Sequence, residues 1–209
     1  MRLVGLTGSL GAGKSTVSHI LSDLGAHLID ADHLAREAVQ KGSPALMKIA
    51  QIFGESFLDE EGQLNRQALA EEVFPDPKKV KILNGIIHPE VRRLKELAYE
   101  QIEAKSPQDT LVYMVPLLFE TGMEKDFQKI ILISIEKKVQ IQRLREGRNF
   151  TLEQIEARLK NQLPQEEKIQ LADFVIDNSG SFAQTTAQMQ QIWPLILALP
   201  PLAVAPWKR

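Results

Sequence analysis

The stretch Gly8-Ser9-Leu10-Gly11-Ala12-Gly13-Lys14-Ser15 decides how the rest of the chain is interpreted. It fits the pattern G-x-x-x-x-G-K-[ST], the phosphate-binding P-loop. Residues 3–7 before it are apolar and predict a buried strand, and the apolar residues from Val17 to Leu24 recur at helical spacing. A strand, a glycine loop and a helix form the context that this motif requires. The sequence therefore predicts a nucleotide phosphate site here.

The residue types of this loop suit a phosphate group. Its glycines let backbone N–H groups approach phosphate oxygens where a Cβ would clash, and the start of the following helix adds N–H donors. Lys14 can reach the β- and γ-phosphates, and Ser15 can hold Mg²⁺. A glycine-rich turn that binds nothing is the alternative, which the flanking pattern disfavours. The predicted nucleotide-binding residues of this segment are Gly8, Gly11, Ala12, Gly13, Lys14, Ser15 and Thr16.

Length and composition narrow the class of protein. The 209 residues predict one domain, with 44% hydrophobic residues to fill its core. A formal net charge of −2 argues against nucleic acid as a partner, and the lack of cysteine excludes disulfides. We see no secretory leader and no apolar run near the ~20 residues of a bilayer span. We therefore expect a cytoplasmic protein that does not insert into a membrane.

Apolar segments that alternate with helical patterns predict a parallel sheet with helices on both faces. Strands are expected over residues 3–7, 26–29, 110–115, 129–134 and 174–176. Helices are expected over 14–24, 33–40, 136–145 and 181–193, with another starting after a Thr151 cap. Residues 44–105 show little strand pattern and predict helices over 67–74, 80–87 and 90–104. We interpret this stretch as a helical insertion over the nucleotide site.

Two acidic residues, Asp30 and Asp32, follow the second predicted strand. Ligands of open α/β sheets bind at the carboxyl ends of the strands. On an extended chain the two side chains would point to the same side. One carboxylate could accept the proton of an attacking hydroxyl, and the other could orient Mg²⁺ through water. The alternative is a pair of N-cap residues for the helix that starts near His33, and both roles could hold at once.

Other polar residues are weaker candidates for ligand contact. His88-Pro89 lies between two predicted helices, where the imidazole could contact a ligand or be structural. Arg143, Arg145 and Arg148 lie near the end of one predicted helix and in the loop that follows it. Such arginines could supply positive charge to a transferred phosphoryl group, or they could simply complement the helix dipole.

The last residues, 192–207, are apolar and contain four prolines. They predict a helix end followed by a strap on the surface or a loose tail. A tail that docks to a partner is the alternative.

Several motifs, in this order, resemble those of the dephospho-CoA kinases, the enzymes of the last step of coenzyme A synthesis. The resemblance extends to about residue 193. The motifs that carry it are Gly5-Leu6-Thr7-Gly8, Asp30-Ala31-Asp32 followed by Ala35-Arg36, Phe53-Gly54, Gly62 with Leu64 and Arg66, Leu83-Asn84 with His88-Pro89, Pro116-Leu117-Leu118-Phe119-Glu120, Gln140 with Arg143-Leu144, Gln162, and Ala172-Asp173 leading to Ile176 and Asn178.

The resemblance implies an α/β, P-loop kinase-like three-layer fold with a five-stranded parallel sheet. The single domain, 1–209, would comprise a core, a helical substrate-binding insertion and a lid. Their expected bounds are about 1–42, 106–135 and 172–193 for the core, 43–105 for the insertion and 143–165 for the lid. The implied reaction is ATP-dependent phosphorylation of the ribose 3′-hydroxyl of dephospho-CoA, with Mg²⁺. We expect a monomer, because no segment other than the tail resembles an interface.

The resemblance also implies a role for individual residues. Asp32 would be the general base, acting with Lys14 and Arg143. The expected Mg²⁺ residues are Ser15 and Asp30. Asn178 and Gly180 would lie near the adenine of ATP. Contacts with dephospho-CoA are expected from Asp32, His88, Pro89 and Leu117.

Two positions depart from the family pattern. Met114 stands where many members have Asp, which leaves Ser15 and Asp30 to hold Mg²⁺. Gly147 stands where members often have an arginine, so Arg148 or Arg145 would have to supply that contact.

Other functions are weighed by the same residues. Another small-metabolite P-loop kinase is the nearest alternative, because some of these also carry an acidic pair after the second strand. A GTP-dependent switch would need a guanine-reading Asn-Lys-x-Asp, and no such run occurs. A nucleotide-binding module without turnover is disfavoured by the intact Lys14, Ser15 and Asp32.

Overall fold

The computed structural model describes residues 1–204 and divides the chain into two compact units. The first unit combines Met1–Asp30 with the chain from Ile102 onward, and the second is Ala31–Gln101. The expected helical insertion, 43–105, falls largely within the second unit. Each unit is described by itself.

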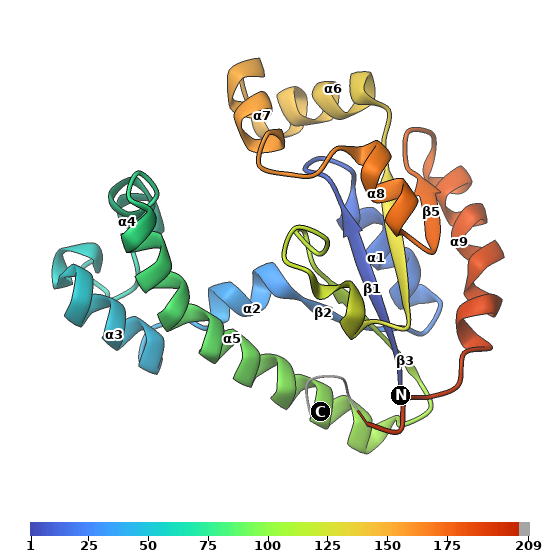
Figure 1. Ribbon diagram of the computed structural model, residues 1–209, viewed down its shortest axis with the longest axis horizontal. Helices are drawn as coiled ribbons and strands as arrows, with labels where there is room; N and C mark the ends of the chain where they lie inside the picture. Colours follow the sequence, from blue (N-terminus) through green and yellow to red (C-terminus); the bar gives the residue numbers. More distant parts are fainter. Residues whose placement is uncertain (205–209) are drawn as a thin grey trace. The chain divides into compact units, whose positions relative to one another are not determined.

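A five-stranded parallel sheet forms the centre of the first unit (Figure 1). Its strands are β1 Arg2–Gly8, β2 His27–Asp30, β3 Thr110–Met114, β4 Lys129–Ser134 and β5 Phe174–Asp177, in the order β2-β3-β1-β4-β5. All four neighbouring pairs are parallel. Near-continuous apolar runs such as Ile130–Ile133 form β4 because the inner strands of a parallel sheet are buried on both faces. The predicted α/β sheet is confirmed.

Helices follow the strands of the first unit as the sequence pattern indicates. They are α1 Lys14–Asp23, α6 Lys137–Arg148, α7 Leu152–Leu159, α8 Gln165–Leu171 and α9 Phe182–Leu197, with a short 3₁₀ turn η2 at Met123–Asp126. Thr151 caps α7 in a capping box with Gln154, which confirms the predicted start. The sequence pattern did not predict α8, because Pro164 precedes it and proline usually ends a helix. Pro164 is instead the N-cap of α8, a position where its missing N–H is harmless.

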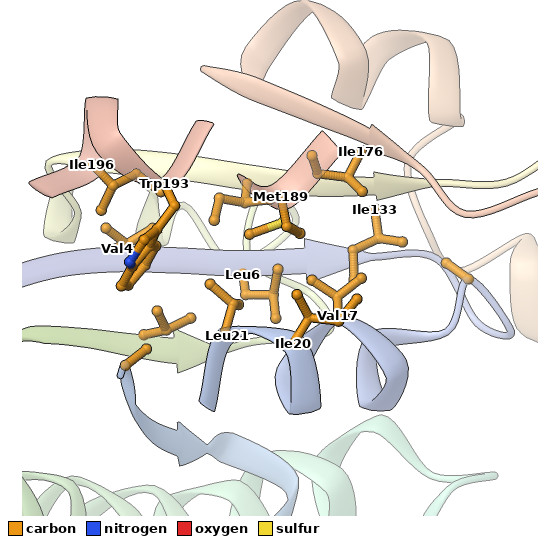
Figure 2. Packing of buried hydrophobic residues seen from close by; sticks show 14 of the residues in the cluster. Val4, Leu6, Val17, Ile20, Leu21, Ile133, Ile176, Met189, Trp193 and Ile196 are labelled. Atoms are coloured by element: carbon orange, nitrogen blue, oxygen red, sulfur yellow. The ribbon is translucent and has the colours of Figure 1, made fainter. Parts of the chain in front are cut away.

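The core of the first unit lies on the sheet face covered by α1 and α9, two helices in contact with each other (Figure 2). Val4 and Leu6 of β1 meet Leu21 of α1 and Trp193 of α9 in this cluster. Each fully buried side chain of this size contributes about 1.5–3 kcal/mol. Ile196 is also fully buried here, and α9 accordingly continues through Pro194 to Leu197, beyond the predicted end at residue 193. The P-loop therefore starts from a rigid, well-packed layer.

The second unit is helical and has its own core. It contains α2 Ala31–Glu37, α3 Pro44–Phe53, the 3₁₀ turn η1 Glu55–Phe57, α4 Arg66–Val73 and α5 Pro77–Lys105, whose last residues pass into the first unit. Ser43 caps α3, since its Oγ accepts the Leu46 N–H at 3.1 Å, and Pro44 occupies the first turn, where proline is tolerated. The buried cluster that holds the unit together comprises Val39, Ala45, Ile49, Leu69 and Val73.

One helical prediction in this unit is wrong. The sequence analysis placed a helix boundary at His88-Pro89, but α5 is a single helix of 29 residues with Pro89 inside it. A proline ring conflicts with the carbonyl group four residues earlier, which here belongs to Gly85. Ile86 and Ile87 pack against the unit's core and support the helix across this point.

The chain beyond α9 returns to the start of β1. The Leu202 N–H donates to the Met1 carbonyl at 3.0 Å, and the Arg2 guanidinium donates to the Leu199 carbonyl at 2.8 Å. This fits the predicted strap as far as residue 204; the remainder of the predicted tail, including Trp207, lies outside the described residues. Of the helices described in residues 1–204, none is both long and apolar enough to cross a bilayer.

Candidate active site

The P-loop lies between the last residue of β1, Gly8, and the first residue of α1, Lys14. Gly11 and Gly13 have φ angles of 78° and 88°, in the left-handed region that glycine adopts without strain. Gly13 is the N-cap of α1 and brings no side-chain cap to it. The Thr16 N–H turns back to the Gly13 carbonyl at 3.0 Å, and the positive end of the helix dipole at the start of α1 suits an anion.

Asn178 supports the P-loop through a hydrogen bond to its backbone. Its side chain is buried, with the Nδ2 group donating to the Ala12 carbonyl at 2.8 Å and Oδ1 accepting from the Thr185 hydroxyl at 2.9 Å. A Cβ on Gly13 would lie only 2.1 Å from Asn178 Nδ2. Sequence reasoning assigned Asn178 to the adenine of ATP and missed this role, because the contact joins residues 166 positions apart.

Two cations lie at the loop. Lys14 Nζ donates to the Gly8 carbonyl at 2.7 Å, so its ammonium is held against the loop backbone. Arg143 of α6 is half-buried, and its Nη1 lies 3.6 Å from where a Cβ on Gly13 would be. Arg145 and Arg148 are exposed, and both belong to α6. The predicted loop position of Arg148 is therefore wrong, since the helix extends to that residue.

Oxygen atoms that suit Mg²⁺ lie at the same edge of the sheet. Ser15 is exposed in the first turn of α1, and Asp30 ends β2. In register, Asp30 pairs with Met114, and Met114 pairs with Leu6 of β1. Met114 packs against the apolar core, which accounts for a methionine at this position. Within residues 1–204 no group of three or more His, Cys, Asp or Glu could hold a metal by itself. Mg²⁺ commonly binds through one or two protein oxygens together with substrate phosphates, and this donor set fits it.

The predicted geometry of Asp32 is wrong. Sequence reasoning placed Asp30 and Asp32 on one extended segment, but α2 begins at Ala31, directly after β2. Asp32 is exposed in the first turn of this helix. Successive helical residues point about 100° apart, so the alternation of a strand does not relate the two carboxylates.

The predicted acceptor-side residues lie on different elements. His88 and Pro89 are exposed on α5 and line a pocket of about 500 Å³. Lys81 and Arg92 line the same pocket and give it a basic border. Leu117 follows β3 in the first unit and is 39% exposed.

Gly180 is exposed beyond the end of β5. A Cβ there would lie 2.3 Å from Gln184 Oε1, the side chain that completes a capping box with Ser181 at the start of α9. A side chain at position 180 would therefore disturb this cap.

A second pocket, of about 540 Å³, lies in the first unit next to the loop. Its lining includes Ser9 of the loop, Gln140 of α6, and Gln162 and Leu163 between α7 and α8. The Gln140 Nε2 group donates to the Leu10 carbonyl at 2.6 Å, and Gln162 Oε1 accepts the Leu10 N–H at 3.2 Å. Sequence reasoning noted both glutamines as motif residues without a role.

A buried ion pair lies behind this pocket. Lys168 of α8 is fully buried, and its Nζ lies 2.8 Å from Glu120 Oε1. The same oxygen accepts the Leu163 N–H at 2.9 Å. Burial alone would raise the pKa of Glu120, but the contact with Lys168 and the backbone N–H donors together hold its pKa below the usual value. Glu120 is therefore ionised at neutral pH.

The site residues of the first unit thus form one group. The P-loop, Arg143, Asn178 and the two glutamines meet at the carboxyl edge of the sheet. Asp32, His88 and Pro89 belong to the second unit and are placed only within it.

Comparisons with known proteins agree with this geometry. The family model described as dephospho-CoA kinase matches residues 2–184. A dephospho-CoA kinase of Carboxydothermus hydrogenoformans is 40% identical over 195 residues, covering 91% of this chain and 92% of that protein.

Two solved structures also match nearly the whole chain. A Thermus thermophilus protein, TT1252, superposes with a TM-score of 0.83 at 31% identity, covering 95% of this chain and 98% of that one. Dephospho-CoA kinase from Campylobacter jejuni superposes with a TM-score of 0.68 at 32% identity, covering 94% and 98%.

Proposed function

This chain belongs to the dephospho-CoA kinase family, and we propose that it transfers the γ-phosphoryl group of ATP to the ribose 3′-hydroxyl of dephospho-CoA. The products are coenzyme A and ADP, so the reaction is the last step of coenzyme A synthesis. The observation that carries the proposal is the glycine loop at the uncapped start of α1, with Lys14 and Arg143 beside it, in a chain of this family.

The loop holds the phosphates of ATP in this proposal. The first-turn N–H groups of α1 bind phosphate oxygens, and Lys14 exchanges its contact with the Gly8 carbonyl for the β- and γ-phosphates. Arg143 places a second positive charge next to Gly13, where it stabilises negative charge on the transferred group. Asn178 and Gly180, at the end of β5, are assigned to the adenine side of the nucleotide.

Ser15 and Asp30 would hold Mg²⁺, which neutralises charge on the β- and γ-phosphate oxygens when it is bound. Asp32 orients the 3′-hydroxyl and accepts its proton. Phosphoryl transfer has little other covalent chemistry for a protein to perform, so positioning and electrostatics supply most of the rate.

The remaining proposed roles are binding of dephospho-CoA and closure over the phosphates. The helical second unit binds dephospho-CoA through His88 and Pro89, with Leu117 contributing from the loop after β3. The segment of about 143–165 closes over the phosphates as a lid and excludes water, which would otherwise hydrolyse ATP. We further propose that the enzyme acts as a monomer in the cytoplasm.

An ADP-release assay with an acceptor panel tests the function. Purified protein and Mg-ATP are mixed with dephospho-CoA, adenosine or shikimate in parallel. We expect release only with dephospho-CoA, and its loss in Asp32→Asn but not in the matched control Asp23→Asn. ADP release that does not depend on dephospho-CoA would contradict the proposal and leave a P-loop ATPase or another metabolite kinase.

A further inference from the structure

One residue of the P-loop, Leu10, is held at both its backbone N–H and its backbone carbonyl by side chains of distant segments. Leu10 donates its N–H to Gln162 and accepts from Gln140 at its carbonyl, with distances of 3.2 and 2.6 Å. The two glutamines lie 152 and 130 positions further along the chain. Backbone chemistry fixes the orientation of both glutamine amides, because an N–H can only donate and a carbonyl can only accept.

The segment that carries Gln162 is itself anchored. The next residue, Leu163, donates its N–H to Glu120, which pairs with the fully buried Lys168 of α8. Pro164 follows and starts α8, and α8 contacts β4. Residues 162–164 therefore join the end of the predicted lid to the sheet and, through Leu10, to the phosphate-binding loop.

Side chains often bind backbone groups because buried N–H and C=O groups need a hydrogen-bond partner. The backbone groups of Leu10 do not need a side chain for this purpose. This residue is only half-buried, and its neighbour Ser9 and both glutamines line a pocket of about 540 Å³. Water could therefore serve its N–H and carbonyl. Gln140 is only 7% exposed, and its amide donates to the loop. If water satisfied the Leu10 carbonyl, the loop would not need a buried amide at this position.

We propose that Gln140 and Gln162 are positioning residues, which set the P-loop in the conformation that binds nucleotide. The Glu120–Lys168 pair anchors the segment that carries Gln162. Neither glutamine needs to touch ATP: each acts through a backbone group of Leu10, three residues before Gly13. The consequence for the reaction rests on the proposed function, whereas the effect on the loop does not.

Amide hydrogen exchange at Leu10, followed by NMR in the enzyme without nucleotide, tests the contact itself. Gln162→Met keeps the length of the side chain but removes the acceptor, and we expect Leu10 to exchange about two- to tenfold faster. Gln162→Glu keeps an oxygen acceptor and is expected to restore slow exchange. The control Gln142→Met, on α6 beside an exposed partner, Glu146, is expected to leave Leu10 unchanged.

Steady-state kinetics tests the consequence. In Gln162→Met and Gln140→Met we expect KM for ATP to rise about two- to tenfold, with KM for dephospho-CoA within about twofold of the wild-type value. Gln140 must donate, so Gln140→Glu is expected to impair ATP binding more than Gln162→Glu, although both add the same charge.

Two results would overturn the inference: unchanged Leu10 exchange in Gln162→Met, or an equal rise in KM for both substrates. The exchange measurement needs no turnover, so failure of this inference and failure of the proposed function can be distinguished.

Discussion

Substituting Gly13 by Ala probes the support of the P-loop directly. The φ angle of 88° at this position costs an L-residue about 1–2 kcal/mol. The new Cβ would lie 2.1 Å from Asn178 Nδ2, so the amide must move and lose its hydrogen bond to the Ala12 carbonyl, worth about 1 kcal/mol. Together these terms predict that Gly13→Ala lowers the free energy of unfolding by about 2–3 kcal/mol.

A double-mutant cycle separates the two terms. Asn178→Ala leaves the buried Ala12 carbonyl without its partner and is itself expected to cost about 1–3 kcal/mol. In the double variant the clash with Asn178 no longer exists, so the two losses should fall short of additivity by about 1 kcal/mol. Urea unfolding followed by circular dichroism measures each free energy, and calorimetric titration measures ATP affinity, which we expect Gly13→Ala to reduce at least tenfold.

Gly147→Ala is the matched control. Gly147 lies in α6 with a negative φ, and nothing lies within 4 Å of an added Cβ. Ala is favoured over Gly in a helix by up to about 1 kcal/mol, so this variant should be as stable as the wild type or more stable. A Gly13→Ala protein of wild-type stability, or full additivity in the cycle, would refute the reasoning.

Three further predictions concern other parts of the chain. Glu120→Gln leaves the buried Lys168 ammonium without its carboxylate partner and should lower the free energy of unfolding by about 3 kcal/mol at pH 7. Because the folded pKa of Glu120 is lowered, its contribution to the free energy of unfolding is complete above the unfolded value of about 4.3 and is lost as the pH falls through the folded pKa. The free energies of variant and wild type, measured by urea unfolding, should therefore converge progressively as the pH falls below about 4.3, and a constant difference would contradict this. Pro89→Ala should raise the urea midpoint and increase the free energy of unfolding by up to about 3 kcal/mol. It should also raise KM for dephospho-CoA but not for ATP. An unchanged midpoint would show that Pro89 does not strain α5. Arg143→Ala should lower kcat about 10²-fold, and the exposed Arg145→Ala should stay within about twofold; similar losses in both would exclude a specific role for Arg143.

The sequence predicts those features that depend on neighbouring residues. The P-loop, the strand before it and α1 follow from one local pattern, and the Thr151 cap follows from another. Errors arise where packing overrides local preference. Pro89 remains inside α5, where Ile86 and Ile87 before it pack against the core and Tyr99 after it is buried, and Pro164 precedes α8 although proline usually ends a helix.

Long-range contacts could not be predicted from the sequence. Nothing in the neighbourhood of Asn178 indicates that its amide supports Ala12, and the spacing of Gln140 and Gln162 does not reveal that both bind Leu10. Such contacts depend on which strands are neighbours and on where the helices end. Membership of one family identifies the reaction, whereas the support of the loop is visible only in the folded structure.

Transfer of label from γ-³²P-ATP tests the central claim most directly. The purified enzyme is incubated with labelled ATP and dephospho-CoA, and the products are separated and treated with a 3′-nucleotidase. We predict label in coenzyme A that the 3′-nucleotidase releases, and no such product from a Lys14→Met variant. Label found only as inorganic phosphate, with dephospho-CoA unchanged, would contradict the account and show that this loop serves hydrolysis and not transfer.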